Sequence, residues 1–308
     1  MTEAPPAWKV WTALGLVYVF WGSTYLGIKY VVETLPPLLS ASLRFTVAGG
    51  LMAAYLVVVR GGSPLRTTRR QLLVAAGTGV LLLLGGNGLV TLAEQQKLPS
   101  SLAALLIAGV PLYVVLLRAG TGDRPRGRTV FGVVLGFAGV ALLLLPGARP
   151  EGVALGPVLL CIAAGVLWSV GSFVSTRLPI PGDSLLTAVV QMLAGGLSLA
   201  LVGWVRGEEL VLSSASGASL AGLAYLVVFG SIVAFTAYSW LLGVAPVSKV
   251  STYAYVNPVV AVLLGVVIAD ETVGLVTVVG GAVTVLAVAV VVSSGQRSPR
   301  ATAPLPRP

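Results

Sequence analysis

The sequence alternates between long apolar stretches and short polar gaps. Each stretch is close to the roughly 20 residues that a helix needs to cross a lipid bilayer, and backbone groups in lipid must pair within their own segment. We therefore expect a helix in each stretch and predict an all-α integral membrane protein with ten transmembrane helices. The stretches are 9–30, 37–59, 71–93, 100–118, 128–146, 153–176, 184–204, 217–242, 250–269 and 273–293.

Other architectures fit this pattern poorly. The strands of an outer-membrane barrel alternate apolar and polar residues over about ten positions, whereas these stretches are apolar throughout. The gaps between them are too short for a soluble domain. The N-terminus lacks a charged region and a small-residue cleavage site, so we expect the first stretch to be a retained helix and not a cleaved signal peptide.

Similar residues recur in the two halves of the chain at a spacing of 146 or 147 positions. Each half holds five of the expected helices, an odd number, so the two halves must cross the bilayer in opposite orientations. We predict two inverted five-helix repeats, 9–146 and 153–293, and a disordered cytoplasmic tail at 294–308. Inverted repeats are typical of transporters that bind their substrate between the repeats, near the middle of the membrane. Matched positions include Trp21 and Trp168, Gly49 and Gly195, Pro99 and Pro246, Pro111 and Pro258, and Asp123 and Asp270.

The charged residues divide between alternate gaps. Fourteen of the 19 Lys and Arg residues lie in the tails and the even-numbered gaps, four lie in the odd-numbered gaps, and Arg44 lies inside the second apolar stretch. Because cytoplasmic loops are enriched in Lys and Arg, we expect a multi-pass protein of a bacterial cytoplasmic (inner) membrane with both termini in the cytoplasm.

The composition narrows the classes of function. Charged residues make up 9% of the 308 residues and hydrophobic residues 56%, whereas soluble domains carry about 25% charged residues; the mean hydropathy is +0.98. The net charge of +9 is explained by basic loops, so no nucleic-acid partner is expected. The chain has no His and a single Cys, Cys161, which argues against a disulfide, a Cys/His metal site and a His-based triad. No phosphate-binding motif for ATP is present, and we expect no cofactor.

Arg44 is the sharpest single signal for a site. It lies about two turns inside the second apolar stretch, where an Arg costs roughly 2.5–3.5 kcal/mol on insertion scales. One interpretation is that it lines a cavity and attracts a carboxylate or another anionic group. The alternative is that its side chain extends to the outer interface or braces a helix end.

A polar stripe marks the third stretch. Asn87, Thr91 and Glu94 are spaced i, i+4 and i+7, so they share one helix face that points to protein or water. Glu94 is the best candidate for proton coupling; the alternative is an ordinary interfacial Glu paired with Lys97. Because the other acids lie in loops, tails or at their edges, strong proton coupling is not indicated, and facilitated diffusion or weak coupling stays open.

Two matched prolines interrupt expected helices. Pro111 and Pro258 each remove a backbone hydrogen bond, which a membrane helix tolerates where a neighbour or a cavity satisfies the freed carbonyl. Thr252 and Tyr255 share a face just before Asn257 and Pro258. We interpret the prolines as breaks at a binding site or gate, with a packing kink as the alternative.

Aromatic residues form a second group of candidates. Trp21 and Tyr25 lie in the first stretch, Trp168 in the sixth and Tyr238 in the eighth. In a cavity they would favour planar or apolar cargo; the alternative is packing or an interfacial belt. Gly132, Gly136 and Gly139 share a face that permits close helix contact, within one chain or in a dimer.

Several stretches resemble the EamA family of the drug/metabolite transporter superfamily. The first group is the run Trp21-Gly22-Ser23-Thr24-Tyr25 with Leu35-Pro36-Pro37 and Leu43-Arg44-Phe45, which resembles the first repeat of the family. Two longer stretches are similar to the YedA-type branch of bacterial inner-membrane permeases: GGNGLVTLAEQQKLPSSLAALLIAGVPL (85–112) and FGSIVAFTAYSWLLGVAPVSKVSTYAYVNPVVAVLLG (229–265). The resemblance covers about residues 10 to 293. It departs from the family where a Gly-Glu pair often precedes the last helix of each repeat, since Asp270-Glu271 and Asp123-Arg124 stand there.

The resemblance implies ten helices in two repeats and the movement of small metabolites or drugs, commonly outward. We therefore hypothesise a secondary transporter, not an enzyme, that exports an amino-acid-like metabolite or drug by alternating access as a monomer or homodimer. An intramembrane enzyme and a passive channel are the alternatives. The expected substrate-binding residues are Trp21, Thr24, Tyr25, Arg44, Asn87, Thr91, Trp168, Tyr238, Thr252, Tyr255 and Asn257, with Pro111 and Pro258 at helix breaks and Glu94 for coupling.

Overall fold

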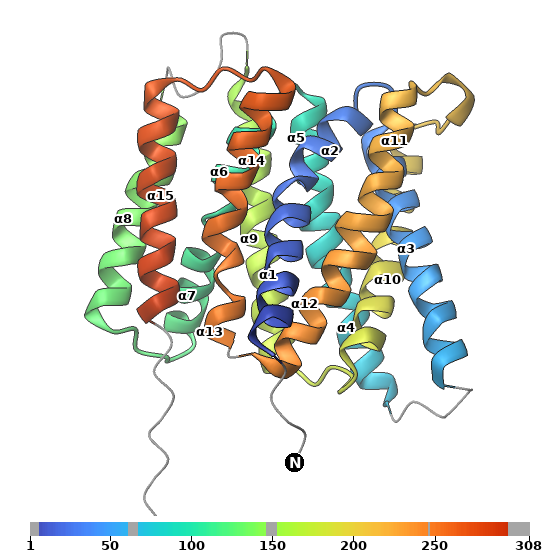
Figure 1. Ribbon diagram of the computed structural model, residues 1–308, viewed down its shortest axis with the longest axis horizontal. Coiled ribbons are helices and arrows are strands. Elements are labelled where there is room, and N and C mark those ends of the chain that lie inside the picture. The colour runs from blue at the N-terminus through green and yellow to red at the C-terminus, as the bar shows by residue number, and fades with distance from the viewer. Residues whose placement is uncertain (1–5, 61–66, 146–152, 246, 295–308) are drawn as a thin grey trace, which may run out of the picture.

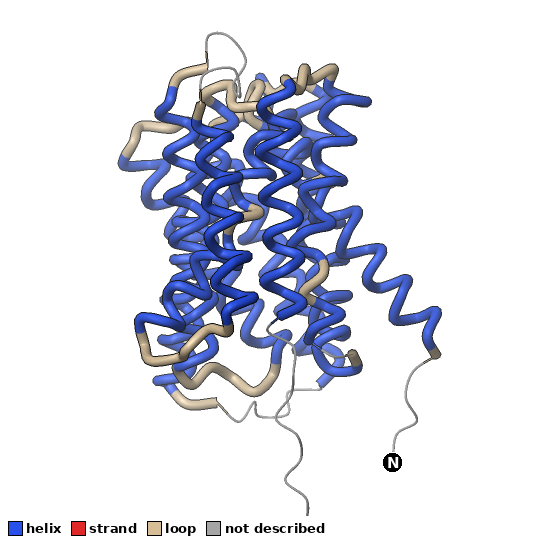
Figure 2. Tube along the Cα trace, turned by 90° about the vertical axis from the view of Figure 1, so that its left-hand side faces the viewer, coloured by secondary structure: helices blue, strands red, loops and turns tan. Residues whose placement is uncertain are grey.

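The computed structural model describes residues 6–60, 67–145, 153–245 and 247–294. Within these ranges the protein is helical and contains no strand (Figure 2). The helices run side by side in one bundle; the longer connections between them lie at its two ends, and short non-helical segments interrupt helices inside it (Figures 1 and 2). The all-α membrane fold expected from the apolar stretches is confirmed. The tail expected at 294–308 lies outside the described residues from position 295 onward.

The helical segments follow the expected stretches closely. In the first half they are α1 (Ala7–Gly22), α2 (Thr24–Val31), α3 (Pro37–Arg60), α4 (Arg69–Gly79), η1 (Val80–Gly88), α5 (Leu89–Gln95), α6 (Ser100–Ile107), α7 (Val110–Gly120) and α8 (Gly127–Leu144). In the second half they are α9 (Leu155–Arg177), α10 (Ser184–Val205), η2 (Leu212–Ser214), α11 (Gly217–Tyr225), η3 (Leu226–Val233), α12 (Ala234–Val244), α13 (Val247–Val250), α14 (Tyr253–Ala269) and α15 (Leu275–Ser294).

Eight helical stretches among the described residues are long and apolar enough to cross a membrane: Pro37–Val59, Arg69–Gln95, Ser100–Gly120, Gly127–Leu144, Leu155–Arg177, Ser184–Val205, Gly217–Tyr238 and Leu275–Ser294. The other two expected stretches are interrupted. Residues 9–30 fall in α1 and α2, which meet at Ser23, where the hydroxyl donates to the Phe20 carbonyl oxygen at 3.1 Å. Residues 250–269 contain α14, which is only 17 residues long because the chain turns at Ser251 and Thr252.

Two of the long helical stretches contain a π-helical segment at matching positions. η1 continues α4 into α5, and η3 continues α11 into α12. The two segments begin at Val80 and Leu226, and 226 minus 80 is 146, the spacing of the recurring residues. Because π turns are rare and often mark functional sites, η1 and η3 are candidate positions for a functional site.

Glycine residues allow the two halves to pack closely. α3 packs on α10, and α8 packs on α15. A Cβ atom on Gly139 would lie 2.5 Å from Thr284 Oγ1, and one on Gly196 would lie 2.7 Å from Thr46 Cγ2. Gly136 instead accommodates Leu112 of α7. These glycines therefore serve contacts within the chain.

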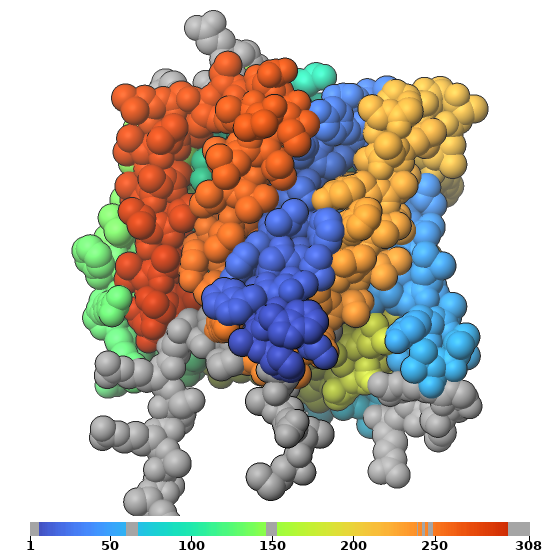
Figure 3. Space-filling view, in the orientation of Figure 1, coloured from blue at the N-terminus to red at the C-terminus, as the bar shows by residue number. Residues whose placement is uncertain are grey.

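Further contacts between the halves follow the same pattern. α1 packs on α12 and α14, and α9, its counterpart by sequence spacing, packs on α5 and α7. In the space-filling view α1 lies between α14 and α12 and covers the middle of that face (Figure 3).

The outer surface is apolar along the helices and charged at their ends. Leu201, Leu263 and Leu286 are about 60% exposed (60%, 59% and 63%), as suits side chains that face lipid. One end, the lower one in Figure 1, holds the start of α1 and the ends of α7, α9 and α15. The described basic residues near that end are Lys9, Arg69, Arg70, Arg118, Arg124, Arg126, Arg128, Arg177 and Lys249, and those near the other end are Lys29, Lys97 and Arg206.

Candidate functional site

Arg44 is buried in the bundle and lacks a complete set of partners. Its side chain leaves α3 and is 4% exposed, so it does not extend to the membrane surface. Nε donates to Ser231 Oγ of η3 at 2.9 Å, and the guanidinium lies 4.7 Å from the Phe45 ring centroid. Nη1 is buried without a hydrogen-bond partner among the described residues. A buried cation in this condition is costly unless an anionic or polar group reaches it.

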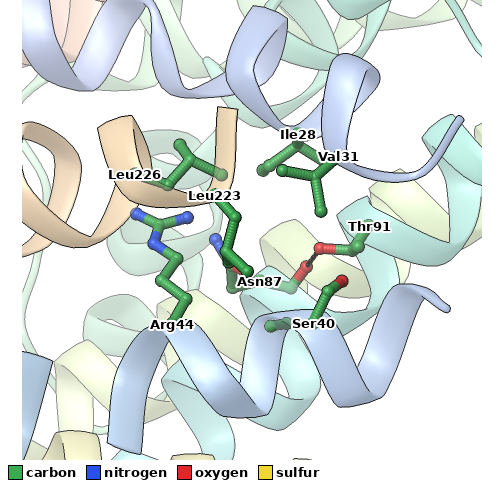
Figure 4. A pocket seen from close by; sticks show the side chains of 9 residues that line it. Ile28, Val31, Ser40, Arg44, Asn87, Thr91, Leu223 and Leu226 are labelled. Atoms are coloured by element: carbon green, nitrogen blue, oxygen red, sulfur yellow. Dashed lines mark hydrogen bonds between the residues drawn. The ribbon is translucent and has the colours of Figure 1, made fainter. Parts of the chain in front are cut away.

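A small pocket opens beside this guanidinium (Figure 4). It has room for about one water molecule. Arg44, Asn87 and Thr91 line it, so the structure brings together three of the expected binding residues. The full lining is Ile28, Val31, Ser40, Ala41, Arg44, Asn87, Thr91, Leu223 and Leu226, from α2, α3, η1, α5, α11 and η3.

The pocket is polar on one side and apolar on the other. Asn87 lies in η1, and its side-chain oxygen is buried without a partner among the described residues. Thr91 Oγ1 donates to the Asn87 carbonyl oxygen at 2.9 Å, the bond drawn in Figure 4. Ile28 and Leu226 lie across from these groups. The arrangement can hold a charged or polar head against Arg44 and Asn87 and an apolar portion against the aliphatic side chains.

Trp21 and Thr24 approach Arg44 through Gly230. Trp21 Nε1 donates to the Gly230 carbonyl oxygen at 3.2 Å. A Cβ atom on Gly230 would lie 3.0 Å from Thr24 Cγ2 and 3.1 Å from Arg44 Nη2. Gly230 therefore leaves the space that the Thr24 and Arg44 side chains share, and its carbonyl oxygen binds Trp21.

An aromatic cluster fills the region between α1, α12 and α14. The ring centroids of Trp21 and Tyr238 are 5.0 Å apart, and Trp21 is 5.2 Å from Tyr253. Trp168, the repeat partner of Trp21, packs against η1, where a Cβ on Gly86 would lie 2.6 Å from its ring. Each of the two matched tryptophans thus contacts a π-helical segment of the opposite half.

The other expected binding residues lie outside this pocket. Tyr25 packs against the apolar core that contains Cys161. Thr252 is hydrogen-bonded to Tyr18, and Tyr255 packs with the cluster around Leu112 and Val288.

Asn257 and Glu94 are unsatisfied polar groups. The Asn257 side-chain oxygen is buried without a partner among the described residues. Glu94 of α5 is 4% exposed, and neither of its carboxyl oxygens has a hydrogen-bond partner there. The alternative of an interfacial Glu94 paired with Lys97 does not match this geometry, since Glu94 is buried and Lys97 is exposed.

The prolines match in sequence, but the helix breaks near them do not. In the first half the break at Ala108 and Gly109 ends two residues before Pro111. In the second half the turn at Ser251 and Thr252 ends six residues before Pro258, which lies inside α14. The two breaks therefore fall at different positions of the repeat.

Two carboxylates close the upper end of the bundle. Glu208 Oε2 accepts hydrogen bonds from Leu38 N at 3.0 Å and Leu39 N at 2.9 Å, at the start of α3. Glu271 accepts from Ser100 N at 2.9 Å and Ser101 N at 3.0 Å, at the start of α6. In both cases a loop of the second half caps a helix of the first half, where a negative charge also complements the helix dipole.

Glu271 also forms an ion pair at this end. Lys29 Nζ of α2 donates to Glu271 Oε1 at 3.0 Å, and the Glu271 side chain is 5% exposed. Burial alone would raise the pKa of the Glu271 carboxyl, but hydrogen bonds from Ser101, Lys29 and Ser100 outweigh it, and the net pKa is lowered. The carboxylate is therefore held in its ionised form.

Sequence reasoning missed Gly230, Ser231 and Tyr253. All three lie within the stretch 229–265 that carries the family resemblance. Ser231 is a small polar residue in an apolar run, which is a usable signal, but its role depends on a partner 187 positions away.

Comparison with known proteins shows the family to which the chain belongs. A model of the EamA-like transporter family matches residues 9–145 and 155–293. The "Uncharacterized inner membrane transporter YedA" of Escherichia coli strain K12 is 39% identical over 84% of this chain and 83% of its own length. These two matches confirm the resemblance seen in the sequence.

More distant proteins share the same extent. An "Uncharacterized transporter" of Archaeoglobus fulgidus is 27% identical over 92% of this chain and 99% of its own length. The "Probable amino-acid metabolite efflux pump" of Escherichia coli strain K12 is 23% identical over 83% of this chain and 85% of its own. One solved crystal structure superposes with a TM-score of 0.63 and 25% identity over 94% of this chain and 98% of that chain.

Proposed function

Because the chain belongs to the EamA-like transporter family, we propose that it is a secondary transporter that exports a small amphipathic carboxylate by alternating access. Family, relatives and apolar helices make it a multi-pass inner-membrane transporter. The proposal adds the substrate class, the alternating-access mechanism and the outward direction of transport.

The incomplete hydrogen bonding of Arg44 carries the proposal. A fully satisfied structural Arg would have partners for all its N–H groups, whereas Arg44, which lines the pocket, leaves Nη1 without a partner among the described residues. A carboxylate is the group that an Arg fork binds best. Asn87 adds a second polar contact, and Ile28 and Leu226 favour an apolar substituent. An amino acid with an apolar side chain has this combination, which agrees with the name of one relative, the "Probable amino-acid metabolite efflux pump" of Escherichia coli.

The small size of the pocket supports alternating access. A site with room for about one water molecule cannot hold an amino acid until helices move apart. The caps made by Glu208 and Glu271 join the two halves at one end, so their separation would open that end. We interpret the structure as a closed state of a carrier that opens to each side in turn.

Ten helices in two inverted repeats remain part of the proposal. The reciprocal packing of α3 on α10 and α8 on α15, and the spacing of 146 between η1 and η3, support it. The excess of basic residues near the lower end in Figure 1 supports cytoplasmic termini. One chain supplies the whole pocket lining, so a monomer suffices for transport, and a homodimer would join two complete sites.

A thermal-shift screen of the purified protein tests the substrate class. We would compare apolar amino acids, nucleosides and cationic drugs. A ligand at about 100 times its Kd stabilises the folded state by about 2.7 kcal/mol. We expect apolar amino acids to raise the denaturation temperature of the wild type. Arg44→Gln should remove this shift, and Arg206→Gln, which changes an exposed arginine, should keep it.

Counterflow in proteoliposomes tests the mechanism with the same amino acid. Unlabelled amino acid inside the vesicles should accelerate uptake of the labelled form. A channel would show no such acceleration. Stabilisation by nucleosides or cations alone, or a normal shift in Arg44→Gln, would show that the substrate class is wrong.

A further inference from the structure

Glu94 is a buried acid that the proposed binding pocket does not use. It lies on α5, one turn beyond Thr91, and only 4% of its surface is exposed. Neither carboxyl oxygen has a hydrogen-bond partner among the described residues. Burial of an acid with so few hydrogen bonds destabilises the folded protein, and ionisable residues inside membrane helices usually have a function.

The groups that face Glu94 do not compensate an ionised carboxylate. Tyr25 and Lys29 of α2, Cys161 of α9 and Glu271 of the α14–α15 connection interact with it electrostatically. Lys29, the cation of this group, donates to Glu271 at 3.0 Å. Glu271 itself adds a second negative charge nearby. An ionised Glu94 would therefore be buried without a counter-ion of its own.

The protonated form fits this environment much better. A buried, unpaired ion costs several kcal/mol more than a buried neutral group of the same shape. The cost would fall if Lys29 became available, because an ion pair stabilises an ionised carboxylate. Lys29 becomes available when the α14–α15 connection leaves α2 and α6, which is the opening motion of the upper end.

We propose that Glu94 is a proton-binding site that couples transport to the proton gradient. It takes one proton from water, carries it as a neutral carboxylic acid while the bundle is closed, and releases it to water at the upper end when Lys29 separates from Glu271. Only the O–H bond of the carboxyl group forms and breaks. The release step rests on the opening motion of the proposed function, whereas proton binding in the closed state does not.

Labelling of the wild-type protein tests proton binding without a substrate. Dicyclohexylcarbodiimide, an apolar reagent, reacts with protonated carboxyl groups, and mass spectrometry locates the modified residue. We expect modification of Glu94 at neutral pH and less modification as the pH rises. Glu33 and Glu209, which are exposed at the same end, should stay unmodified. Absence of modification at Glu94 at every pH would overturn the proposal.

Infrared difference spectra provide an independent readout. The carbonyl stretch of a protonated carboxylic acid should be present in the wild type at neutral pH and in Glu209→Gln, and absent in Glu94→Gln. An unchanged band in a folded Glu94→Gln protein would assign the proton to another group. If that variant does not fold, the labelling of the wild type decides alone.

Proton movement completes the test. Vesicles with a trapped pH-sensitive dye receive a mixture of the proteinogenic amino acids. We expect proton flux with the wild type and with Glu209→Gln, and only the flux of protein-free vesicles with Glu94→Gln. Counterflow should persist in Glu94→Gln, because exchange needs no change of protonation. Wild-type counterflow without proton flux would overturn coupling and leave the proposed transport intact; labelled Glu94 without any counterflow would overturn the transport proposal and retain the proton site.

Discussion

A single buried cation sets the chemistry of the pocket. Arg44 is held from one side by Ser231, while Gly230 leaves the space that its Nη2 and Thr24 share. The position is thus prepared by residues of η3, although Arg44 itself belongs to α3. This division matters because motion of η3 relative to α3 would change both the orientation and the access of the guanidinium.

Ser231→Ala should weaken the protein and the site together. It leaves Arg44 Nε without a partner, and an unsatisfied buried donor costs about 1–3 kcal/mol. We expect a lower denaturation temperature and a smaller stabilisation by apolar amino acids, both measured on purified protein in detergent.

Ser198→Ala is the matched control, because among the described residues the Ser198 hydroxyl donates only to the Gly195 carbonyl oxygen of its own helix, at 2.7 Å. Equal effects of the two substitutions would mean that the bond between Ser231 and Arg44 has no special role.

Residue by residue, the sequence shows which side chains are out of place in lipid and not what they contact. Arg44, Asn87 and Glu94 stand out because each is polar in an apolar stretch. The partner of Arg44 could not be predicted, since Ser231 comes from the other half of the chain. The sequence left facilitated diffusion or weak coupling open for the same reason: it shows that Glu94 lies near the end of a helix, but not that α2 and α9 bury it.

At the scale of elements, the caps on α3 and α6 join the two halves. Glu208 and Glu271 supply the carboxylates, and Asp270 sets the second turn with a φ of 50°. This left-handed conformation suits Gly best and Asp or Asn next, so Asp270 fits the position at which the family resemblance implies a Gly.

Glu271→Gln should destabilise the closed end in a pH-dependent manner. The pKa of Glu271 is lowered in the folded protein, so its contribution to the free energy of unfolding is present above the ordinary pKa of about 4.5 and is lost as the pH falls through the lowered value. We expect a loss of about 2 kcal/mol at neutral pH, and a smaller difference from the wild type in acid. Thermal denaturation across this pH range measures it.

Glu33→Gln provides the control, because Glu33 is an exposed acid near the same end. A difference between Glu271→Gln and the wild type that stays constant down to acidic pH would contradict the assigned role of the carboxylate.

The sequence predicted the positions of the helices better than their interruptions. Pro111 and Pro258 mark perturbed helices, but the turn before α14 ends six residues ahead of Pro258. The π segments leave no signal of their own, because η1 and η3 are as apolar as regular membrane helices. Their geometry depends on how α9 and α10 pack on η1, and α3 on η3, and these are contacts between distant parts of the chain.

At the scale of the whole molecule, the two ends differ in charge and in chemistry. The basic residues gather at one end, and the caps made by Glu208 and Glu271 lie at the other. The first fact predicts an orientation with the basic end in the cytoplasm, and in that orientation the acidic caps would lie outside the cell.

Cysteine labelling in intact cells tests this orientation. In a Cys161→Ser background, Asp270→Cys should react with a membrane-impermeant maleimide, and Arg69→Cys should react only after permeabilisation. Both positions are exposed, so reactivity reports the side of the membrane. Labelling of both in intact cells would contradict opposite faces and, with them, the inverted arrangement of the halves.

For the whole molecule the sequence was informative because lipid imposes simple rules. Hydropathy gives the fold class, and the family resemblance is confirmed by the match over residues 9–145 and 155–293. The sequence could not show that the bundle is closed around a pocket of about one water molecule, since this depends on how the two halves sit together.

The wide turns of η1 and η3 give the protein an unusual sensitivity to chain length. Each fixes the rotational phase of the helix that follows it, and one residue of an α-helix corresponds to about 100° of rotation. Deleting one residue within Val80–Gly88 would swing Thr91 and Glu94 away from α2 together, although neither was altered. Single-residue deletions there should therefore be far less tolerable than substitutions at the same sites, whatever the side chains exchanged.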